Sequence, residues 1–303
     1  MRVSVGICTW NRARLLEQTL SGMERLRIPP GVDWEVLVVN NRCSDDTDDV
    51  IARHAGRLPL RWLFEPRPGK SHALNAAVAA LRSDLTLWID DDALPEPQWL
   101  EEYVRAFQES PAAAFYGGPI DPWFEIEPPA WLLRAFPLIG FTYATLDLGK
   151  APCPLSKGAL PFGANYAIRT SVQKAYTYDP KLGRIHSWML AGEETELFER
   201  LLADGHEGAW VPGARVRHWV PRERMTEKYL REYFFGLGQT EALRGKACQR
   251  RRRPYLCWRA LVSDVKYQLF RRIGGPSLWV RALTRASYLR GLMAGPVQER
   301  RLA

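Results

Sequence analysis

Short apolar runs alternate with polar clusters over the first 110 residues of the chain. Four such runs predict buried strands at residues 3–8, 34–39, 60–64 and 85–89, and an apolar spacing typical of helices follows each of them. A repeated order of strand, turn and helix predicts a parallel sheet with right-handed crossovers. We therefore expect an α/β fold with a mostly parallel central sheet flanked by helices.

The fourth apolar run ends in three consecutive carboxylates, Asp90–Asp92, and Pro95 and Pro97 prevent the strand from continuing. Carboxylates at the end of a buried strand repel one another and are costly to desolvate. A divalent cation relieves that cost, and hard oxygen ligands suit Mg²⁺ or Mn²⁺. A solvated acidic turn is the alternative interpretation of the same residues.

Polar residues also follow the other three predicted strands, in the segments 9–12, 40–45 and 67–70. The carboxyl ends of parallel strands meet at one edge of a sheet, and ligands of open α/β sheets bind outside those ends. Taken singly, Thr9 and Asn11 are explained as helix caps and Lys70 as a solvated loop charge. Their expected convergence with Asp90–Asp92 favours a binding site.

The middle of the chain is less regular, because prolines repeatedly interrupt residues 111–161. We expect a loop-rich region here, whose aromatic side chains either stack on a sugar or meet a lipid chain, or else cover a hydrophobic groove: Trp123, Trp131, Phe136, Phe141 and Tyr143. A strand is expected over residues 162–169. A helix is expected from residue 192 to about 205, and its acidic first turn is either an ordinary N-terminal helix signal or the location of a catalytic base.

The C-terminal part of the chain is strongly basic. Residues 244–303 contain 15 Lys and Arg against 2 Asp and Glu, a local charge of +13, whereas the first 243 residues carry −5. A helix is expected over residues 226–237. Basic helices that interleave Trp, Phe and Leu are expected over residues 255–273 and 277–293, and they suit an anionic membrane surface. A solvated basic face on packed helices is the alternative. We expect no nucleic-acid partner, because no recognition module is found.

The overall composition is that of a globular protein, with 46% hydrophobic and 25% charged residues among 303. No apolar run is long enough to span a bilayer, and the N-terminus shows no signal-peptide pattern. Five scattered cysteines without metal-site spacing fit a reducing compartment. We therefore expect a cytoplasmic protein, peripheral at the inner face of the cell membrane.

Four motifs in order carry a family resemblance: CTWNR at residues 8–12, VVNNRCSDDT at 38–47, PGKSHALN at 68–75 and WIDDDALPEP at 88–97. Together they resemble the nucleotide-sugar half of a family 2 glycosyltransferase with the GT-A fold. The resemblance covers residues 1–220 and implies a nucleotide-binding half at 1–110 and an acceptor half at 111–220. A basic, amphipathic helical appendage is expected at 221–303.

The resemblance also implies the residues that bind a nucleotide-sugar: Thr9, Asn11, Arg12, Asn40, Asn41, Asp45, Lys70, Asp90, Asp91 and Asn165. Asn40 stands where the family usually has an aspartate that meets the uracil edge, and an amide can still donate and accept there. Asp90 and Asp92 would be the two ends of the family's Asp-x-Asp motif, with Asp90 near the ribose and Asp92 on the metal.

Two further motifs imply the catalytic base and a third metal ligand. Residues 192–197, GEETEL, match a family pattern whose aspartate aligns with Glu194, so Glu194 is the implied base and Glu193 its neighbour. The glutamate departs from the pattern by one methylene. His218 ends a second pattern and is implied as a metal ligand or a diphosphate contact. A structural histidine at a strand end is the alternative.

The implied function is a metal-dependent, inverting transfer of a sugar from a nucleotide-diphosphate donor, with UDP expected as the nucleotide. Mn²⁺ or Mg²⁺ is the expected cofactor. The acceptor would be a glycan or a lipid-linked glycan in cell-surface polysaccharide synthesis. A non-catalytic sugar-nucleotide or glycan-binding protein on the same fold is the alternative. A nucleotidyltransferase would need a glycine-rich phosphate loop after the first strand, and residues 8–11 do not form one.

Overall fold

A computed structural model of the chain describes residues 1–180, 192–242 and 253–295. The chain divides into two compact units. The first contains residues 1–123, 144–183 and 193–219, and the second contains residues 124–143, 184–192 and 220–303. Residues 124–143, which we expected in the acceptor half, therefore belong with the C-terminal helices. Cys248 and the arginines at 250–252 lie outside the described residues.

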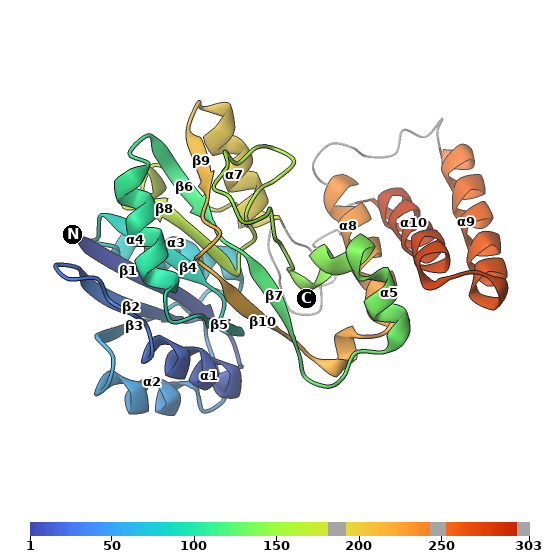
Figure 1. The fold of residues 1–303 in the computed structure, drawn as a ribbon. Helices are drawn as coiled ribbons and strands as arrows, with labels where there is room; N and C mark the ends of the chain where they lie inside the picture. Colours follow the sequence, from blue (N-terminus) through green and yellow to red (C-terminus); the bar gives the residue numbers. More distant parts are fainter. Residues whose placement is uncertain (181–191, 243–252, 296–303) are drawn as a thin grey trace. The chain divides into compact units, whose positions relative to one another are not determined.

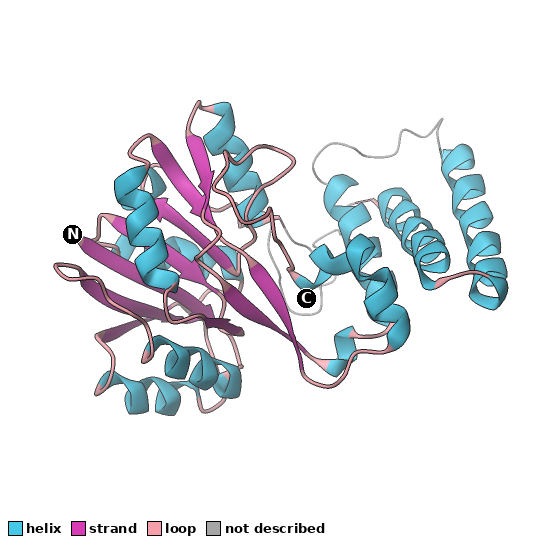
Figure 2. Ribbon diagram, viewed as in Figure 1, coloured by secondary structure: helices cyan, strands magenta, loops and turns pink. Residues whose placement is uncertain are grey.

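The first unit is built on a sheet whose seven described strands have the order β3-β2-β1-β4-β8-β6-β9 (Figures 1 and 2). Their bounds are β1 Arg2–Thr9, β2 Asp33–Asn40, β3 Leu60–Phe64, β4 Leu85–Ile89, β6 Ala113–Gly117, β8 Asn165–Arg169 and β9 Glu207–Trp210. Strands β3, β2, β1 and β4 are parallel, β8 lies antiparallel between β4 and β6, and β9 is parallel to β6. The predicted, mostly parallel sheet is confirmed.

Helices cover both faces of this sheet. On one face lie α1 Ala13–Met23, α2 Thr47–Ala55 and α4 Trp99–Glu109, and on the other lie α3 Lys70–Ala80 and α7 Glu193–Ala203. The short α6, Thr170–Gln173, follows β8. The alternation of side chains along a strand explains the two faces, since Val36 and Val38 join the first cluster while Leu37 and Val39 join the second.

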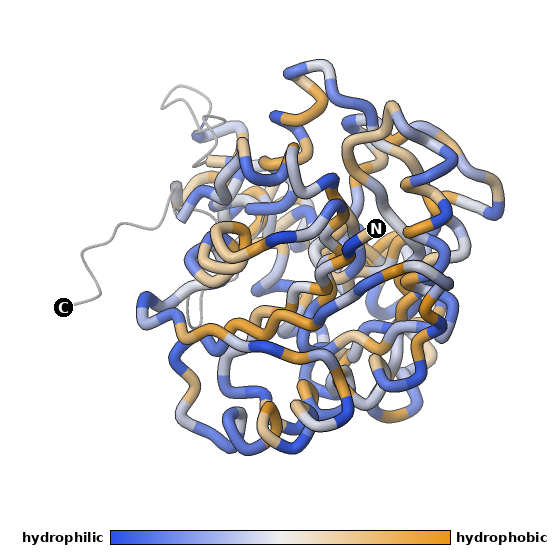
Figure 3. The backbone as a smooth tube through the Cα atoms, turned by 90° about the vertical axis from the view of Figure 1, so that its left-hand side faces the viewer, coloured by the Kyte–Doolittle hydropathy of each residue, from blue (hydrophilic) through white to orange (hydrophobic). Residues whose placement is uncertain are grey.

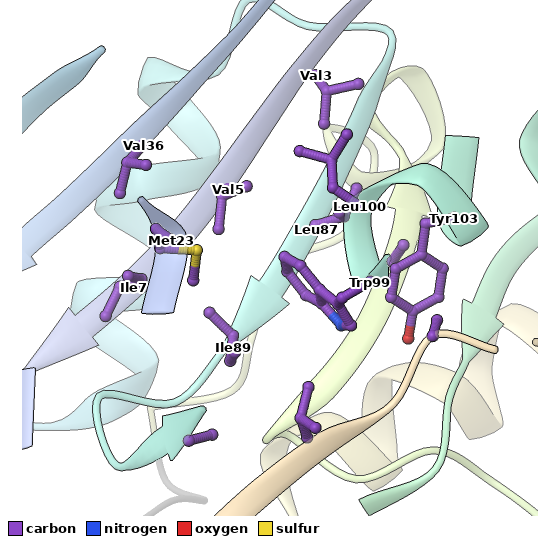
Figure 4. Close-up of a cluster of buried hydrophobic side chains, with 14 of the residues drawn as sticks. Val3, Val5, Ile7, Met23, Val36, Leu87, Ile89, Trp99, Leu100 and Tyr103 are labelled. Carbon is purple, nitrogen blue, oxygen red and sulfur yellow. The ribbon is translucent and has the colours of Figure 1, made fainter. Parts of the chain in front are cut away.

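The first of these clusters is drawn in Figure 4, where Val5, Leu87 and Trp99 meet between the sheet and α4. On the other face, Gly6 lies opposite Trp88 in the pairing of β1 with β4. A Cβ atom on Gly6 would lie 2.6 Å from the Trp88 ring, so only glycine leaves room for that indole. Figure 3 shows the same organisation, with hydrophobic colour along extended segments and hydrophilic colour at the peripheral turns.

A second, three-stranded sheet joins distant parts of the chain in the order β5-β10-β7, with the bounds β5 Ala93–Pro95, β10 Val216–Val220 and β7 Ile120–Phe124. Strand β5 begins directly after Asp92 and pairs antiparallel with β10, which places His218 opposite Ala93. We had expected the prolines to end extended structure after Asp92. A short strand forms nevertheless, because Pro95 is its last residue.

The second unit is helical. Its elements are α5 Ala130–Ile139, the 3₁₀ turns η1 Gly140–Tyr143 and η2 Arg222–Arg224, α8 Glu227–Glu241, α9 Arg253–Ile273 and α10 Pro276–Ala294. Trp131 packs on Trp279, and Phe136 stacks on Tyr143 within its core. Trp131, Phe136 and Tyr143 therefore cover a hydrophobic surface. Phe141 is 40% exposed and Trp123 packs on Trp219 in the first unit, so for these two the contact with a sugar or a lipid chain stays a prediction. Within the described ranges, no helix has the length and apolarity needed to cross a membrane.

Candidate active site

Three potential metal ligands meet where β4 ends. One ligand atom each of Asp90, Asp92 and His218 lies within 4.8 Å of the others. Asp92 and His218 are buried, and Asp90 is partly exposed. The Nδ1 atom of His218 has no hydrogen-bond partner in the described part of the chain, and its Nε2 lies 3.2 Å from Asp92 Oδ1. The carboxylates suit Mg²⁺ or Mn²⁺, and the imidazole favours a transition metal such as Mn²⁺.

Backbone hydrogen bonds hold this acidic turn in place. The amide of Trp219 donates to the carbonyl oxygen of Asp92 at 2.8 Å, which keeps the neighbouring His218 beside the aspartates. The Thr19 hydroxyl donates to the carbonyl oxygen of Asp91 at 2.9 Å. Since both Asp91 and Asp92 are also buried, the alternative of a solvated acidic turn does not describe this segment.

Arg12 neutralises two of the three aspartates. Its Nη1 donates to Asp91 Oδ1 at 3.0 Å and to Asp92 Oδ2 at 2.8 Å. Burial raises the pKa of Asp91 to about 6. The charge of Asp92 adds to this effect, and the charge of Arg12 only partly opposes it. The charges of Asp91 and Asp92 in turn raise the pKa of Arg12, so its guanidinium is a permanent cation at the site.

Lys70 links the acidic turn to the candidate base. It is the first residue of α3, and its Nζ lies 2.8 Å from Asp90 Oδ1 and 2.7 Å from Glu194 Oε1. Burial alone lowers the pKa of Lys70, but the negative charges of Asp90, Glu194 and Glu193 outweigh it and hold the pKa well above its ordinary value. Lys70 is therefore a partly buried charge with two partners, and not a solvated loop residue.

Gly163, which belongs to a Gly-x-Asn segment of the sequence but had no predicted role, lies against this ion pair. A Cβ atom on Gly163 would lie 2.2 Å from Glu194 Oε1 and 3.0 Å from Lys70 Nζ. The absence of a side chain therefore creates the space that the Glu194 carboxylate occupies. The glycine two residues before Asn165 was the available sequence signal, because an isolated glycine beside a strand often marks a close approach.

The loops after β1 and β2 are tied together. Asn11, with a φ of +50°, accepts a hydrogen bond from the amide of Ser44 at 2.7 Å. Asp45 accepts from the amide of Ala13 at 2.9 Å and from the Thr47 hydroxyl at 2.5 Å. Burial raises the pKa of Asp45, but these hydrogen bonds outweigh it and lower the pKa below the ordinary value. Asp45, and not Thr9 or Asn11, therefore accepts the hydrogen bond of the first backbone amide of α1.

Asn40 and Asn41 organise the loop that follows β2. Asn40 donates to Asp48 Oδ1 at 2.7 Å and accepts from the amide of Cys43 at 2.8 Å. Asn41 donates to the carbonyl oxygens of Glu65 and Arg67 and accepts from the amide of Gly69 at 3.0 Å. Asn41 thereby fixes the loop that delivers Lys70. Both asparagine side chains are buried and form hydrogen bonds within the protein, so their assignment to the nucleotide stays a prediction.

Asn165 has a structural role in place of the predicted sugar contact. Its side chain is fully buried, and its Oδ1 accepts from Trp99 Nε1 at 2.7 Å and from the Tyr103 hydroxyl at 2.8 Å. Its Nδ2 donates to the carbonyl oxygens of Pro119 and Ala214. All the hydrogen-bonding capacity of the amide is therefore used in joining α4 to the start of β7 and to the segment before β10.

A cavity of about 300 Å³ opens beside the acidic turn, lined by residues 11–15, Asp45 and Trp219. Arg12 belongs both to this lining and to the contacts with Asp91 and Asp92. Trp219 adds an aromatic wall, with the Arg14 guanidinium 5.8 Å from its ring centre. The cavity thus combines fixed cations with an aromatic surface, which suits an anionic ligand such as a phosphate ester.

Comparison with known sequences gives a family for this site. The sequence model described as glycosyl transferase family 2 matches residues 4–152, which contain every motif from Thr9 to Asp92. The succinoglycan biosynthesis protein ExoM of Rhizobium meliloti is 24% identical over 247 residues, which cover 79% of this chain and 74% of ExoM. These matches confirm the family that the four motifs predicted.

Solved structures show the same fold. A mannosyltransferase from Pyrobaculum calidifontis, PcManGT in complex with GDP-Man and Mn²⁺, superposes with a TM-score of 0.58 at 18% identity and covers 95% of this chain and 69% of that one. Residues 1–349 of TarS from S. aureus superpose with a TM-score of 0.57 at 12% identity, and the match covers 95% of this chain and 89% of the TarS chain. The predicted GT-A fold is therefore confirmed.

Proposed function

Since the chain belongs to glycosyl transferase family 2, we propose that it is a metal-dependent transferase that moves a sugar from a nucleotide-diphosphate donor to an acceptor hydroxyl, inverting the anomeric carbon. One observation carries the proposal: Lys70 connects the cluster of Asp90, Asp92 and His218 to the carboxylate of Glu194. The site therefore joins the two parts that such a reaction requires. One is a cluster that can hold a diphosphate-binding cation, and the other is a buried carboxylate.

The residues present fit a divalent cation. Asp90, Asp92 and His218 would hold it, with His218 Nε2, 3.2 Å from Asp92 Oδ1, as the nitrogen that faces the carboxylates. When bound, Mn²⁺ or Mg²⁺ supplies positive charge that stabilises the departing diphosphate. Arg12 adds fixed positive charge from the chain itself, so the cavity beside it is the proposed place of the diphosphate.

The chain's own residues then perform the proton transfer. Glu194 accepts the proton of the acceptor hydroxyl as that oxygen forms a bond to the anomeric carbon. The bond from the anomeric carbon to the diphosphate oxygen breaks, and the diphosphate leaves with the electron pair. Lys70 and the space at Gly163 hold the Glu194 carboxylate in position. Attack and departure on opposite faces give inversion.

The donor, acceptor and location complete the proposal. UDP remains the expected nucleotide, although the solved structures of this fold include one with GDP-Man and one with UDP. The acceptor is a glycan or lipid-linked glycan in polysaccharide synthesis, in line with the name of ExoM. The activity would lie at the cytoplasmic face of the membrane, where a lipid-linked acceptor is within reach.

A thermal-shift screen of nucleotide-sugars tests the proposal. We expect at least one donor to raise the melting temperature in the presence of Mn²⁺, because a ligand that binds only the folded state stabilises it by about 2.7 kcal/mol at a hundredfold excess over its Kd. EDTA should abolish this shift, and the donor that gives it should be hydrolysed or transferred. Binding without any turnover would assign the chain to the non-catalytic alternative.

Replacing Gly163 by alanine should lower turnover without lowering donor affinity. The new Cβ would collide with Glu194 Oε1, so the carboxylate must move, and a displacement of about 1 Å costs roughly 100-fold in rate. Gly158→Ala is the matched control, because a Cβ there meets nothing within 4 Å. Steady-state kinetics of both variants check this, and equal rates for the two would contradict the position given to Glu194.

A further inference from the structure

Helix α9 carries an exposed apolar stripe along its outer side. Trp258, Leu261, Val265, Leu269 and Ile273 form it, with spacings of three and four residues that place them on one face. Each of these side chains is between 49% and 76% exposed. Of the 21 residues of α9, only Ala260 and Ser263 are buried, whereas α10 buries Trp279, Val280, Leu283 and others. The stripe is therefore not used for packing within the described part of the second unit.

Helices α9 and α10 lie side by side (Figure 1), and a groove of about 530 Å³ lined by both runs beside the stripe. Its walls include the apolar side chains of Phe270 and Leu278, and four cationic side chains line it: Arg259 and Lys266 from α9, and Arg281 and Arg285 from α10. Apolar walls between guanidinium and ammonium groups suit an amphiphile with an anionic head.

Within α9 and α10 the positive charge of this surface has almost no acidic counterpart. Asp264 is the only acidic residue of α9 and α10, and Arg290 binds it. Arg271 pairs with Glu227 of α8. Among the described residues, no carboxylate forms an ion pair with any of the four groove cations. An anionic partner would therefore meet free positive charge directly next to exposed Trp and Leu side chains.

Two other occupants fit this surface less well. A second copy of the chain docked through the same face would bring these cations against one another, which disfavours an isologous contact. The neighbouring sequence at 244–252 carries arginines and a lysine and no acidic residue, so it does not complement the groove either. A surface that is at once basic and rich in Trp and Leu has the composition of an interfacial helix.

We propose that the apolar stripe of α9 and the basic groove beside it dock the protein on an anionic phospholipid bilayer. The stripe enters the boundary between headgroups and acyl chains, and Arg259, Lys266, Arg281 and Arg285 bind lipid phosphates. The docking surface supplies the location assumed in the proposed function but takes no part in its chemistry, so lipid binding and donor turnover can fail independently.

Vesicle sedimentation of the full chain tests this surface. We expect binding to phosphatidylcholine vesicles that contain phosphatidylglycerol, little binding to phosphatidylcholine alone, and weakening by salt. Leu261→Glu should weaken binding at least about tenfold, because it removes apolar contact and adds a like charge. The double variant Arg281→Ala/Arg285→Ala should weaken it by about tenfold or more and reduce the salt dependence.

Leu133→Glu is the matched control, since Leu133 is an exposed leucine on α5 of the same unit, 51% exposed against 62% for Leu261. It should bind vesicles as the wild type does, and all variants should keep the wild-type melting temperature and donor turnover. Failure of the wild type to sediment with anionic vesicles would overturn the proposal. An equal loss of vesicle binding in Leu133→Glu would also overturn it. A wild-type dimer that Leu261→Glu dissociates would assign the stripe to self-association and overturn it as well.

Discussion

The variant Glu194→Gln should bind the donor normally and lose nearly all sugar transfer. An amide has the shape of the carboxylate but cannot accept the proton of the acceptor hydroxyl, and removal of a general base costs about 10²- to 10⁴-fold in rate. The substitution also removes one of the two charged partners of Lys70, which keeps its contact with Asp90. Steady-state transfer kinetics, together with donor binding measured by calorimetry, check both parts.

Glu193→Gln is the control that separates the two adjacent carboxylates. Glu193 is also buried and also raises the pKa of Lys70, but Glu194 is the residue that lies on Lys70 and against Gly163. We expect Glu193→Gln to lose far less activity than Glu194→Gln. The reverse order would transfer the role of the base to Glu193 and leave the rest of the site unchanged.

The variant Asp92→Asn should lose Mn²⁺-dependent donor binding and transfer together. Asp92 belongs to the metal cluster and is buried with His218. Among the described residues it is the one buried carboxylate of that cluster, so an amide in its place removes a charged ligand. Loss of several kcal/mol of charge stabilisation corresponds to a decrease of about 100-fold or more in kcat/KM. Activity measured over a range of Mn²⁺ concentrations gives both the affinity and the maximal rate.

Asp91→Asn is the matched control for Asp92→Asn, because the two aspartates are adjacent and both are buried. Asp91 contacts the same Arg12 nitrogen but does not belong to the cluster of metal ligands. We therefore expect Asp91→Asn to retain its Mn²⁺ dependence. Equal loss of metal dependence in both variants would mean that neutralisation of Arg12, and not ligation of the metal, explains the effect of Asp92.

Local patterns in the sequence predicted the elements that carry the site. The apolar run at 60–64 is β3 to the residue, and the helical pattern expected after it is α3, which begins at Lys70. Because polar residues followed each parallel strand, the convergence of Arg12, Lys70 and the aspartates could be predicted from topology alone. The sequence could not predict that Arg12 binds Asp91 and Asp92, since that contact depends on side-chain geometry.

Long-range pairing was beyond what local patterns reveal. His218 reaches Asp92 only because β5 pairs with β10, and a three-residue strand ending in proline gives almost no sequence signal. Asn165 was placed by its motif at the sugar, but its partners Trp99 and Tyr103 come from a helix more than 60 residues earlier. Residues 124–143 join the C-terminal helices through Trp131 and Trp279, another contact that the sequence does not disclose.

A crystal of the protein soaked with Mn²⁺ and a nucleoside diphosphate tests the central claim most directly. The account predicts an anomalous manganese peak within coordination distance of Asp92 and His218, with the diphosphate on the same ion and next to Arg12. A diphosphate bound away from these residues, or a manganese peak elsewhere with Asp90 and Asp92 still held by Lys70 and Arg12, would contradict it.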